Sequence, residues 1–121
     1  MSTGYVIFAH GSSVESANDA VRTVAAEMAR RGGLETVVAA FLEGGQPDLP
    51  GALEALAKDV SRVVVVPYFL TLGLHLQRDL PKLIEQVKKA HPGLVIAVTP
   101  PLDQHPAMVE ALLDRARQAC P

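Results

Sequence analysis

Four short runs of apolar residues recur along the chain, and each is continuous rather than alternating with polar residues. The runs cover residues 5–9, 36–42, 63–70 and 94–98. Continuous apolar runs of this length indicate strands that are buried on both faces, as in a parallel sheet. Pro67 lies within the third run, and because proline donates no ladder hydrogen bond it predicts the end of that strand or a bulge.

The segments between and after these runs carry apolar residues at the spacing of a helix. The expected apolar stripes are Val14, Ala17, Val21, Val24, Ala25 and Met28; then Leu53, Leu56 and Ala57; then Leu80, Leu83, Ile84 and Val87; and finally Met108, Val109, Leu112, Leu113 and Ala116. We expect Gly32-Gly33 to end the first helix, and Asp48 with Pro50 to begin the second.

The repeated order of strand and helix predicts an α/β fold with right-handed crossovers. We expect a single domain over residues 1–121: a flavodoxin-like, four-stranded parallel sheet with helices on both faces and the strand order 2-1-3-4. In that order the first three strands are neighbours, about 4.8 Å apart, so side chains at their tips can reach one ion.

Composition removes several other classes of function. The chain has 121 residues, 49% of them hydrophobic, and a net charge of −2 without a basic tract, which argues against a nucleic-acid partner. The longest apolar stretch, residues 63–74, contains Pro67, Thr71 and Gly73 and is too short to span a bilayer. With Cys120 as the only cysteine and no signal-peptide pattern, we expect a cytoplasmic protein without disulfides.

Three residues with metal-binding side chains follow the first three runs. They are His10, Glu43 and His75, separated by 33 and 32 residues, about the length of one strand–helix unit. In a parallel sheet the carboxyl ends of the strands converge on one crevice, where ligands usually bind. Two imidazoles and one carboxylate suit a first-row divalent metal. The sequence therefore predicts a metal site and catalytic centre formed by these three residues.

Besides the metal site, the turn after the first strand has one structural interpretation and a second functional one. As a structural feature, Gly11 gives the backbone freedom to turn and Ser12 caps the first helix. That explanation accounts for Gly11 and Ser12 but gives no reason for a histidine at position 10. The exposed amides of a helix start also attract anions, so Gly11, Ser12 and Ser13 are candidate contacts to an acidic substrate.

The other candidates have ordinary explanations beside the functional ones. Glu43 taken alone would be a solvated loop residue, and a histidine between leucines, such as His75, can simply be hydrogen-bonded. Asp79 is expected to cap the third helix, with orientation of His75 as the alternative. Arg78 is close enough to His75 in sequence to contact substrate. The lysines of this helix are expected to form a solvated face, and His91 and His105 to mark helix ends.

Several short motifs together resemble a known family. They are His10-Gly11-Ser12; Phe41-Leu42-Glu43 with Pro47; and Gly73, His75, Asp79 and Pro81 in the pattern G-x-H-x-x-x-D-x-P. From residue 5 to residue 113 the chain resembles the small, single-domain CbiX-type sirohydrochlorin chelatases, relatives of the class II chelatases that insert cobalt or iron into tetrapyrroles.

The resemblance implies a function and a site. His10 and His75 would bind metal and handle pyrrole protons, and Glu43 would complete the site. The divalent metal would be a substrate and not a permanent cofactor: Co2+ first, with Fe2+ or Ni2+ as alternatives, and the tetrapyrrole the second substrate. The small members of the family pair as homodimers. Ser13 and Asp103 depart from the family, where many members have arginine and glycine.

Two rival functions fit parts of the same pattern. A phosphatase or phosphotransfer domain could use the His10-Gly11 turn, but histidine phosphatases have an arginine before this histidine, where this chain has Ala9. A non-catalytic carrier of metal or tetrapyrrole would use the same residues as a chelatase. The sequence does not separate a carrier from a chelatase.

Overall fold

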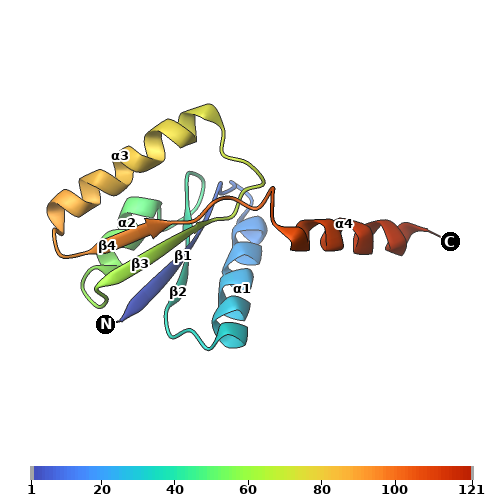
Figure 1. Ribbon diagram of the computed structural model, residues 1–121, viewed down its shortest axis with the longest axis horizontal. Helices are drawn as coiled ribbons and strands as arrows, with labels where there is room; N and C mark the ends of the chain where they lie inside the picture. Colours follow the sequence, from blue (N-terminus) through green and yellow to red (C-terminus); the bar gives the residue numbers. More distant parts are fainter. Residues whose placement is uncertain (1, 121) are drawn as a thin grey trace.

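The computed structural model describes residues 2–120, in which four strands alternate with four helices (Figure 1). The elements are β1 (Thr3–Ala9), α1 (Glu15–Gly32), β2 (Val37–Phe41), α2 (Leu49–Leu56), β3 (Arg62–Pro67), α3 (Leu74–Ala90), β4 (Val95–Val98) and α4 (Pro106–Ala119). The strands form one parallel sheet in the order β2-β1-β3-β4, which confirms the predicted topology. Pro67 is the last residue of β3, as its missing amide hydrogen predicts.

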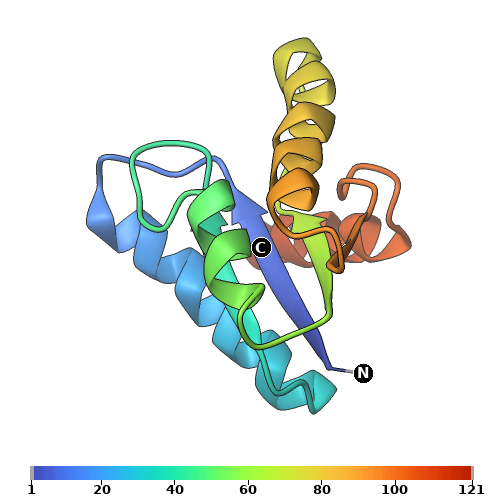
Figure 2. The same ribbon diagram turned by 90° about the vertical axis from the view of Figure 1, so that its left-hand side faces the viewer.

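Helices lie on both faces of the sheet, and their packing explains the continuous apolar runs. On one face, α2 and α3 cover the sheet in a core that includes Phe8, Val65, Leu53 and Ile84 (Figure 2). On the other face, α1 runs along β1 and β2. Because alternate residues of β1 face opposite sides of the sheet and both sides are covered, five of its seven residues are buried.

The ends of three helices follow their sequence signals. Gly33 ends α1 in the left-handed region, at φ 63°. The Asp48 side chain caps α2 by accepting a hydrogen bond from the Gly51 amide at 2.8 Å. His105 caps α4, because its Nδ1 accepts from the Ala107 amide at 3.0 Å. These contacts confirm the second helix start and the role of His105 at a helix end.

Two predicted helix starts are wrong. The N-cap of α1 is Val14 and not Ser12. Ser12 lies two residues before it, and its hydroxyl accepts a hydrogen bond from the Val14 amide. Helix α3 begins at Leu74 after Gly73, so Asp79 lies in its second turn and does not cap it. The sequence misplaced this start because Pro81 normally marks a first turn, whereas here it lies inside the helix.

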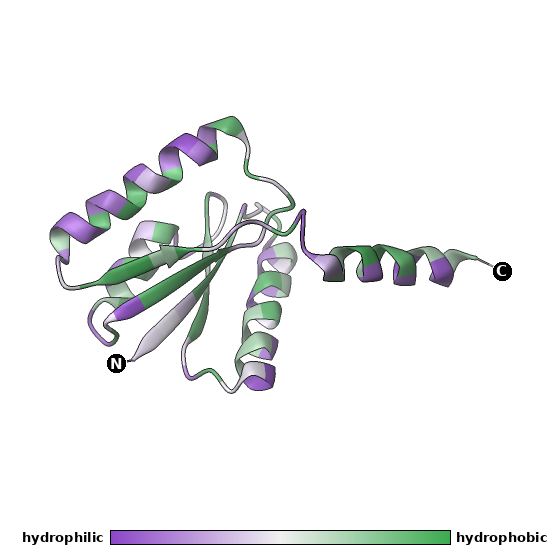
Figure 3. Cartoon of the chain, viewed as in Figure 1, coloured by the Kyte–Doolittle hydropathy of each residue, from purple (hydrophilic) through white to green (hydrophobic). Residues whose placement is uncertain are grey.

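The fourth helix carries its predicted apolar stripe but does not cover the sheet. Helix α4 extends away from the rest of the chain in Figure 1, and the structure, which describes it throughout, has no buried residue in it. Leu112 is 66% exposed, and Figure 3 shows the apolar positions of α4 facing no other element. The expectation that this stripe packs against the chain's own core is therefore wrong.

The direction of α4 is set by the segment that leads into it. The amides of Leu102 and Asp103 donate hydrogen bonds to the carbonyls of Phe69 and Leu70, at 3.0 and 2.9 Å. These bonds tie the segment to the loop after β3. The face of the sheet beside α1 is consequently uncovered over β4, where Val95 is 47% exposed.

None of the helices described between residues 2 and 120 combines the length and the hydrophobicity needed to span a membrane.

Candidate functional site

The tips of the neighbouring strands β1 and β2 bring His10 and Glu43 together. The strands are paired up to Ala9 and Phe41, and the Glu43 amide then donates to the His10 carbonyl at 3.0 Å. His10 Nε2 lies 3.6 Å from Glu43 Oε1, and the two side chains are 62% and 71% exposed. The predicted meeting of these two residues is confirmed. Because an exposed pair of this kind contributes little stability, it can separate to admit an ion.

The hydrogen bond on the other ring nitrogen gives His10 a defined tautomer. His10 Nδ1 lies 3.1 Å from the Gly11 carbonyl oxygen. A carbonyl can only accept, so Nδ1 carries a hydrogen, and in the neutral form of the ring the lone pair of Nε2 faces Glu43. A histidine that ligates metal usually donates its other N–H to a carbonyl or carboxylate in this way. Two lone-pair donors therefore face each other, an arrangement that a cation stabilises.

Two glycines allow the loops that carry these residues to touch. Gly11 has a φ of 89°, and a Cβ atom there would lie 1.7 Å from the Glu43 carbonyl oxygen. Gly44 has a φ of 72°, and a Cβ atom there would lie 2.9 Å from the Ser12 carbonyl carbon. Only glycine fits both the conformation and the contact at each position. The two loops are thus packed backbone against backbone.

His75 lies in the first turn of α3, not in a loop directly beyond a strand as the sequence suggested. Its Nδ1 is 3.1 Å from Nη2 of Arg78. Because a guanidinium can only donate, His75 Nδ1 accepts, and the neutral ring carries its hydrogen on Nε2. Arg78 also contacts Asp79, with 3.4 Å between Nε and Oδ1. Arg78 therefore orients His75.

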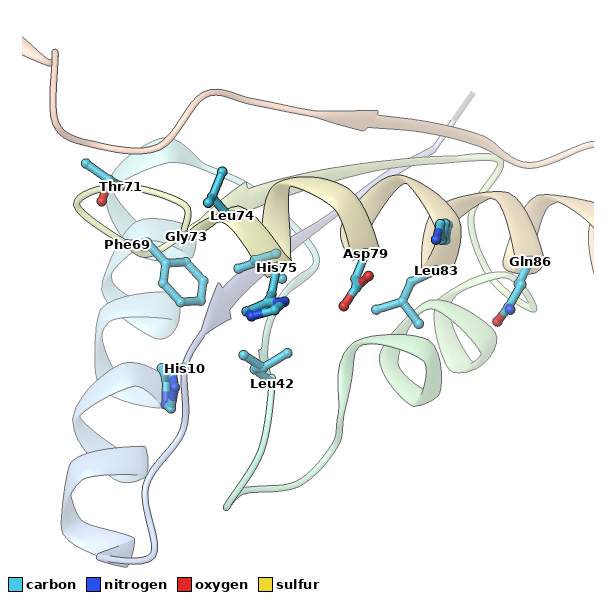
Figure 4. Close-up of a pocket in the computed structure, with 12 residues that line it drawn as sticks. His10, Leu42, Phe69, Thr71, Gly73, Leu74, His75, Asp79, Leu83 and Gln86 are labelled. Atoms are coloured by element: carbon cyan, nitrogen blue, oxygen red, sulfur yellow. The ribbon is translucent and has the colours of Figure 1, made fainter.

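A pocket of about 650 Å3 opens between the strand tips and α3 (Figure 4). We call it the carboxyl-edge pocket, and its lining consists of His10, Leu42, Phe69, Thr71, Gly73, Leu74, His75, Leu76, Asp79, Lys82, Leu83 and Gln86. The volume is within the range of ligand sites, and leucine and phenylalanine side chains form most of the wall. Both predicted histidines line this one pocket.

The three predicted ligands are not assembled into one cluster. Within residues 2–120, no group of three histidine, cysteine, aspartate or glutamate side chains is close enough together to hold a metal ion. Of the described residues, Glu43 lies beside the pocket and not in its lining. His10 is the member shared by the pocket and by the pair with Glu43.

Asp79, Lys82 and Gln86 line the pocket, a position that the sequence did not predict for any of them. All three lie on the same side of α3 as His75, because residues three or four positions apart share a helix face. The spacing is visible in the sequence, but a helix that begins at Asp79 does not include His75, so the four residues were not placed on one helix face. Lys82, expected on a solvated face, places a cationic side chain at the pocket wall.

The remaining predicted contacts are less accessible or lie outside the pocket. The Ser12 amide donates to the Asn18 side chain at 3.0 Å, and the Val14 amide donates to Ser12 Oγ at 3.0 Å. These two amides are not free to bind an anion. Ser13 is exposed, and Arg78 lies outside the set of described residues that line the pocket.

Comparison with known proteins identifies the family. The family model described as CbiX matches residues 4–119, which is nearly the whole chain. The chain belongs to the CbiX family. The matched region contains His10, Glu43 and His75 and, apart from Thr3 at the start of β1, all of the helices and strands.

Several curated relatives are named sirohydrochlorin cobaltochelatase, and one from Arabidopsis thaliana, 28% identical over 113 residues, is named a chloroplastic sirohydrochlorin ferrochelatase. A sirohydrochlorin cobaltochelatase from Sulfurisphaera tokodaii is 30% identical over 116 residues, which cover 95% of this chain and 92% of the relative. Another from Methanopyrus kandleri is 35% identical over 80 residues, 65% of this chain. The match spans only 56% of the Methanopyrus protein, so that relative is considerably longer than the shared region.

Solved structures share the fold. A CbiX protein from Marinobacter aquaeolei VT8 superposes with a TM-score of 0.81 at 27% identity, covering 96% of this chain and 95% of that one. The sirohydrochlorin chelatase SirB from Bacillus subtilis, in complex with cobalt, gives a TM-score of 0.88 at 22% identity. This chain spans 51% of the SirB chain, so the match to SirB shows the fold of about half of that protein.

Proposed function

We propose that this CbiX-family protein is a sirohydrochlorin chelatase that inserts a divalent metal into the macrocycle. The observation that carries the proposal is the lone pair of His10 Nε2 facing Glu43 at the rim of an apolar pocket that His75 also lines. A metal ligand pair beside a hydrophobic wall is what the reaction requires. The relatives named sirohydrochlorin cobaltochelatase support the same substrates.

The chemistry follows from the two substrates. The planar macrocycle carries two inner N–H groups, whose protons must leave as the ion forms bonds to the four ring nitrogens. An apolar wall of Leu42, Phe69 and Leu83 suits the face of such a ring. His10 and Glu43 present the ion, and His75 accepts the two protons one after the other at Nδ1, once this atom leaves Arg78, and passes each to water. Two protons are released for each ion inserted.

The ion must be released to the ring, which makes weak protein coordination useful. The pair of His10 and Glu43 supplies two donors, and an open coordination shell leaves positions for pyrrole nitrogens. Imidazole and carboxylate accept Co2+, Fe2+ and Ni2+ alike. We propose Co2+ as the main substrate because of the names of the relatives, with the other two ions as alternatives.

We also propose that the protein is cytoplasmic. Its exposed free thiol, Cys120, is typical of a protein in a reducing compartment.

We propose that the working unit is a homodimer. One copy supplies a pocket that is open on one side, whereas ligand sites usually bury most of the surface of their ligand. Two-fold pairing of identical chains is the commonest way to add a second wall.

Helix α4 supplies a means of pairing. It offers an apolar stripe without a core to cover, and Val95 and Ala97 of the same chain lie on a sheet face without a helix. In doubly wound folds the helix that follows a strand normally packs back on its sheet. Exchange of α4 between two copies would satisfy both surfaces, at the carboxyl end of the sheet from which α4 leaves (Figure 1).

The proposed activity is tested by spectrophotometric assay of sirohydrochlorin with Co2+, Fe2+ and Ni2+ in separate reactions, each with and without the protein. Metal insertion changes the absorption spectrum of the macrocycle, so the rate is read directly. We expect acceleration that is proportional to protein concentration, greatest with Co2+. Rates equal to the uncatalysed rates with all three ions would exclude a chelatase.

A further inference from the structure

One polar side chain is buried between the two loops that carry the candidate ligands. Among residues 2–120, Asn18 is the only buried polar or charged residue, with 1% of its surface exposed. It lies in the first turn of α1, beneath the turn that follows His10 and the turn that follows Glu43. A buried amide is costly unless each of its groups is hydrogen-bonded, so its partners show what it does there.

The carboxamide of Asn18 bonds to the backbone of both loops. Its oxygen accepts from the Ser12 amide at 3.0 Å, and its nitrogen donates to the Ser12 carbonyl at 2.8 Å. The same nitrogen donates to the Gly44 carbonyl at 3.1 Å. Ser12 is two residues after His10, and Gly44 is the residue after Glu43. One side chain therefore fixes the positions of both loops.

The contacts leave little room for other arrangements. A Cβ atom at Gly45 would lie 3.0 Å from Asn18 Nδ2, so the loop after Glu43 passes directly over the amide. The outer end of the same cluster is held by Arg22, which bonds to Glu15 at 2.6 Å and to the Gln46 carbonyl at 3.1 Å. The hydrogen bond from Arg22, and to a lesser degree that from Asn18, lowers the pKa of Glu15. Asn18 and Arg22 thus connect helix α1 to these loops by side-chain hydrogen bonds.

We propose that Asn18 is a positioning residue that sets the separation of His10 and Glu43 and thereby the affinity of the site for the incoming ion. This inference rests on the proposed function, because it assigns the ion to that pair. Asn18 lies on α1, while the apolar wall of the carboxyl-edge pocket is formed largely by α3 and the loop before it. A change at Asn18 should therefore act on the metal and leave the macrocycle's contacts intact.

The test uses two substitutions and one control in the full-length protein. Asn18→Asp keeps the size and the acceptor for the Ser12 amide, but directs an oxygen at the carbonyls of Ser12 and Gly44. Asn18→Ala removes every bond. The control is Ala25→Gly, at the other buried position of α1, which destabilises the helix without touching either loop. Thermal unfolding of each variant measures the stability that each change removes.

Two readouts separate positioning from general stability. Co2+ binding without the macrocycle is followed through the visible absorption of the ion, and insertion kinetics give separate KM values for Co2+ and for sirohydrochlorin. We expect both Asn18 variants to bind Co2+ roughly 10- to 100-fold more weakly, as for other residues that orient metal ligands. The KM for Co2+ should rise, while the KM for sirohydrochlorin and the properties of Ala25→Gly stay within about twofold of wild type.

Two results would overturn the inference, and they are distinguishable. Wild-type Co2+ affinity in Asn18→Asp, in a protein whose affinity falls in His10→Ala, would show that Asn18 has no positioning role although the metal site is correctly assigned. Wild-type Co2+ affinity in His10→Ala itself would remove the proposed metal site and the inference together. If Asn18→Ala does not fold, Asn18→Asp decides the question.

Discussion

At the scale of the residue, the proposed chemistry uses two histidines whose Nδ1 atoms make opposite kinds of hydrogen bond. His10 donates through Nδ1 to the Gly11 carbonyl, whereas His75 accepts at Nδ1 from Arg78. The first ring offers a lone pair at Nε2 for the ion. The imidazole of His75 carries its hydrogen on Nε2. It can therefore accept a proton from the macrocycle only at Nδ1, after the hydrogen bond from Arg78 to this atom breaks. Different roles for the two histidines follow from these hydrogen bonds.

We predict that His10→Ala, which removes one of the two proposed ligands of the ion, and His75→Ala, which removes the proposed proton acceptor, each lower kcat/KM for metal insertion roughly 100-fold or more. Both side chains are exposed and lie outside the hydrophobic core, so thermal unfolding should be nearly unchanged. Circular dichroism during heating is the control for folding. Wild-type rates in either folded variant would contradict the role of that histidine.

Glu43→Gln is predicted to raise the KM for Co2+ and to slow insertion. The substitution preserves the size and the oxygen but removes the negative charge that faces His10 Nε2 at 3.6 Å. Initial rates measured against Co2+ concentration check this. Gln46→Glu, which adds a charge in the same loop away from the pair, is the control. Unchanged rates at limiting Co2+ would make Glu43 an ordinary loop residue.

Lys82→Gln is predicted to raise the KM for sirohydrochlorin about two- to fivefold, the worth of one exposed ion pair to a carboxylate of the macrocycle. The KM for Co2+ should not change, because Lys82 lines the pocket on α3 and not at the strand tips. Lys89→Gln, near the far end of the same helix, provides the matched control. An equal effect of both substitutions would indicate a general charge effect instead of a contact in the pocket.

At the scale of the element, the sequence predicted what periodicity and turn residues determine. The four strands, the sheet order, the Gly33 and Asp48 helix ends and the meeting of His10 with Glu43 all follow from local signals. Two features did not. The start of α3 was hidden because Pro81 lies within a helix, and Lys82 was missed with it. Asn18 was also missed, since its partners are backbone groups of loops that no periodicity describes.

The path of α4 is the other feature that periodicity does not determine. An apolar stripe shows that a helix has a face to bury, but not which molecule buries it. Here the hydrogen bonds from Leu102 and Asp103 to the loop after β3 direct the helix away from its own sheet. The stripe was predicted correctly, and its location was not.

If α4 is buried against a partner, Leu112→Asp should weaken the dimer. Burial of one leucine contributes about 1.5–3 kcal/mol, and a two-fold dimer buries two, so we expect the dissociation constant to rise roughly 100-fold or more. Sedimentation velocity at micromolar concentration measures it. Gln118→Asp, with the same change of charge on another side of α4, should remain dimeric. A wild-type species of monomer mass, 12.8 kDa, would rule out the exchange.

At the scale of the whole molecule, the sheet, the pocket and the projecting helix address one requirement. The proposed ion-binding pair lies at the carboxyl ends of β1 and β2, α3 supplies the apolar wall, and α4 leaves the same end of the sheet (Figure 1). A partner held by α4 would lie where the open side of the pocket needs a second wall. Assembly and catalysis are therefore linked in this account.

The central claim is that the protein turns over, using His10 and His75, and does not merely bind its two substrates. The most direct measurement is a time course of Co2+ insertion with sirohydrochlorin in large excess over protein, for the wild type and for the double variant His10→Ala/His75→Ala. We expect many product molecules per wild-type chain and a rate for the double variant close to that without protein. Product that stops at one equivalent per site would identify a carrier, and full turnover by a folded double variant would contradict the site.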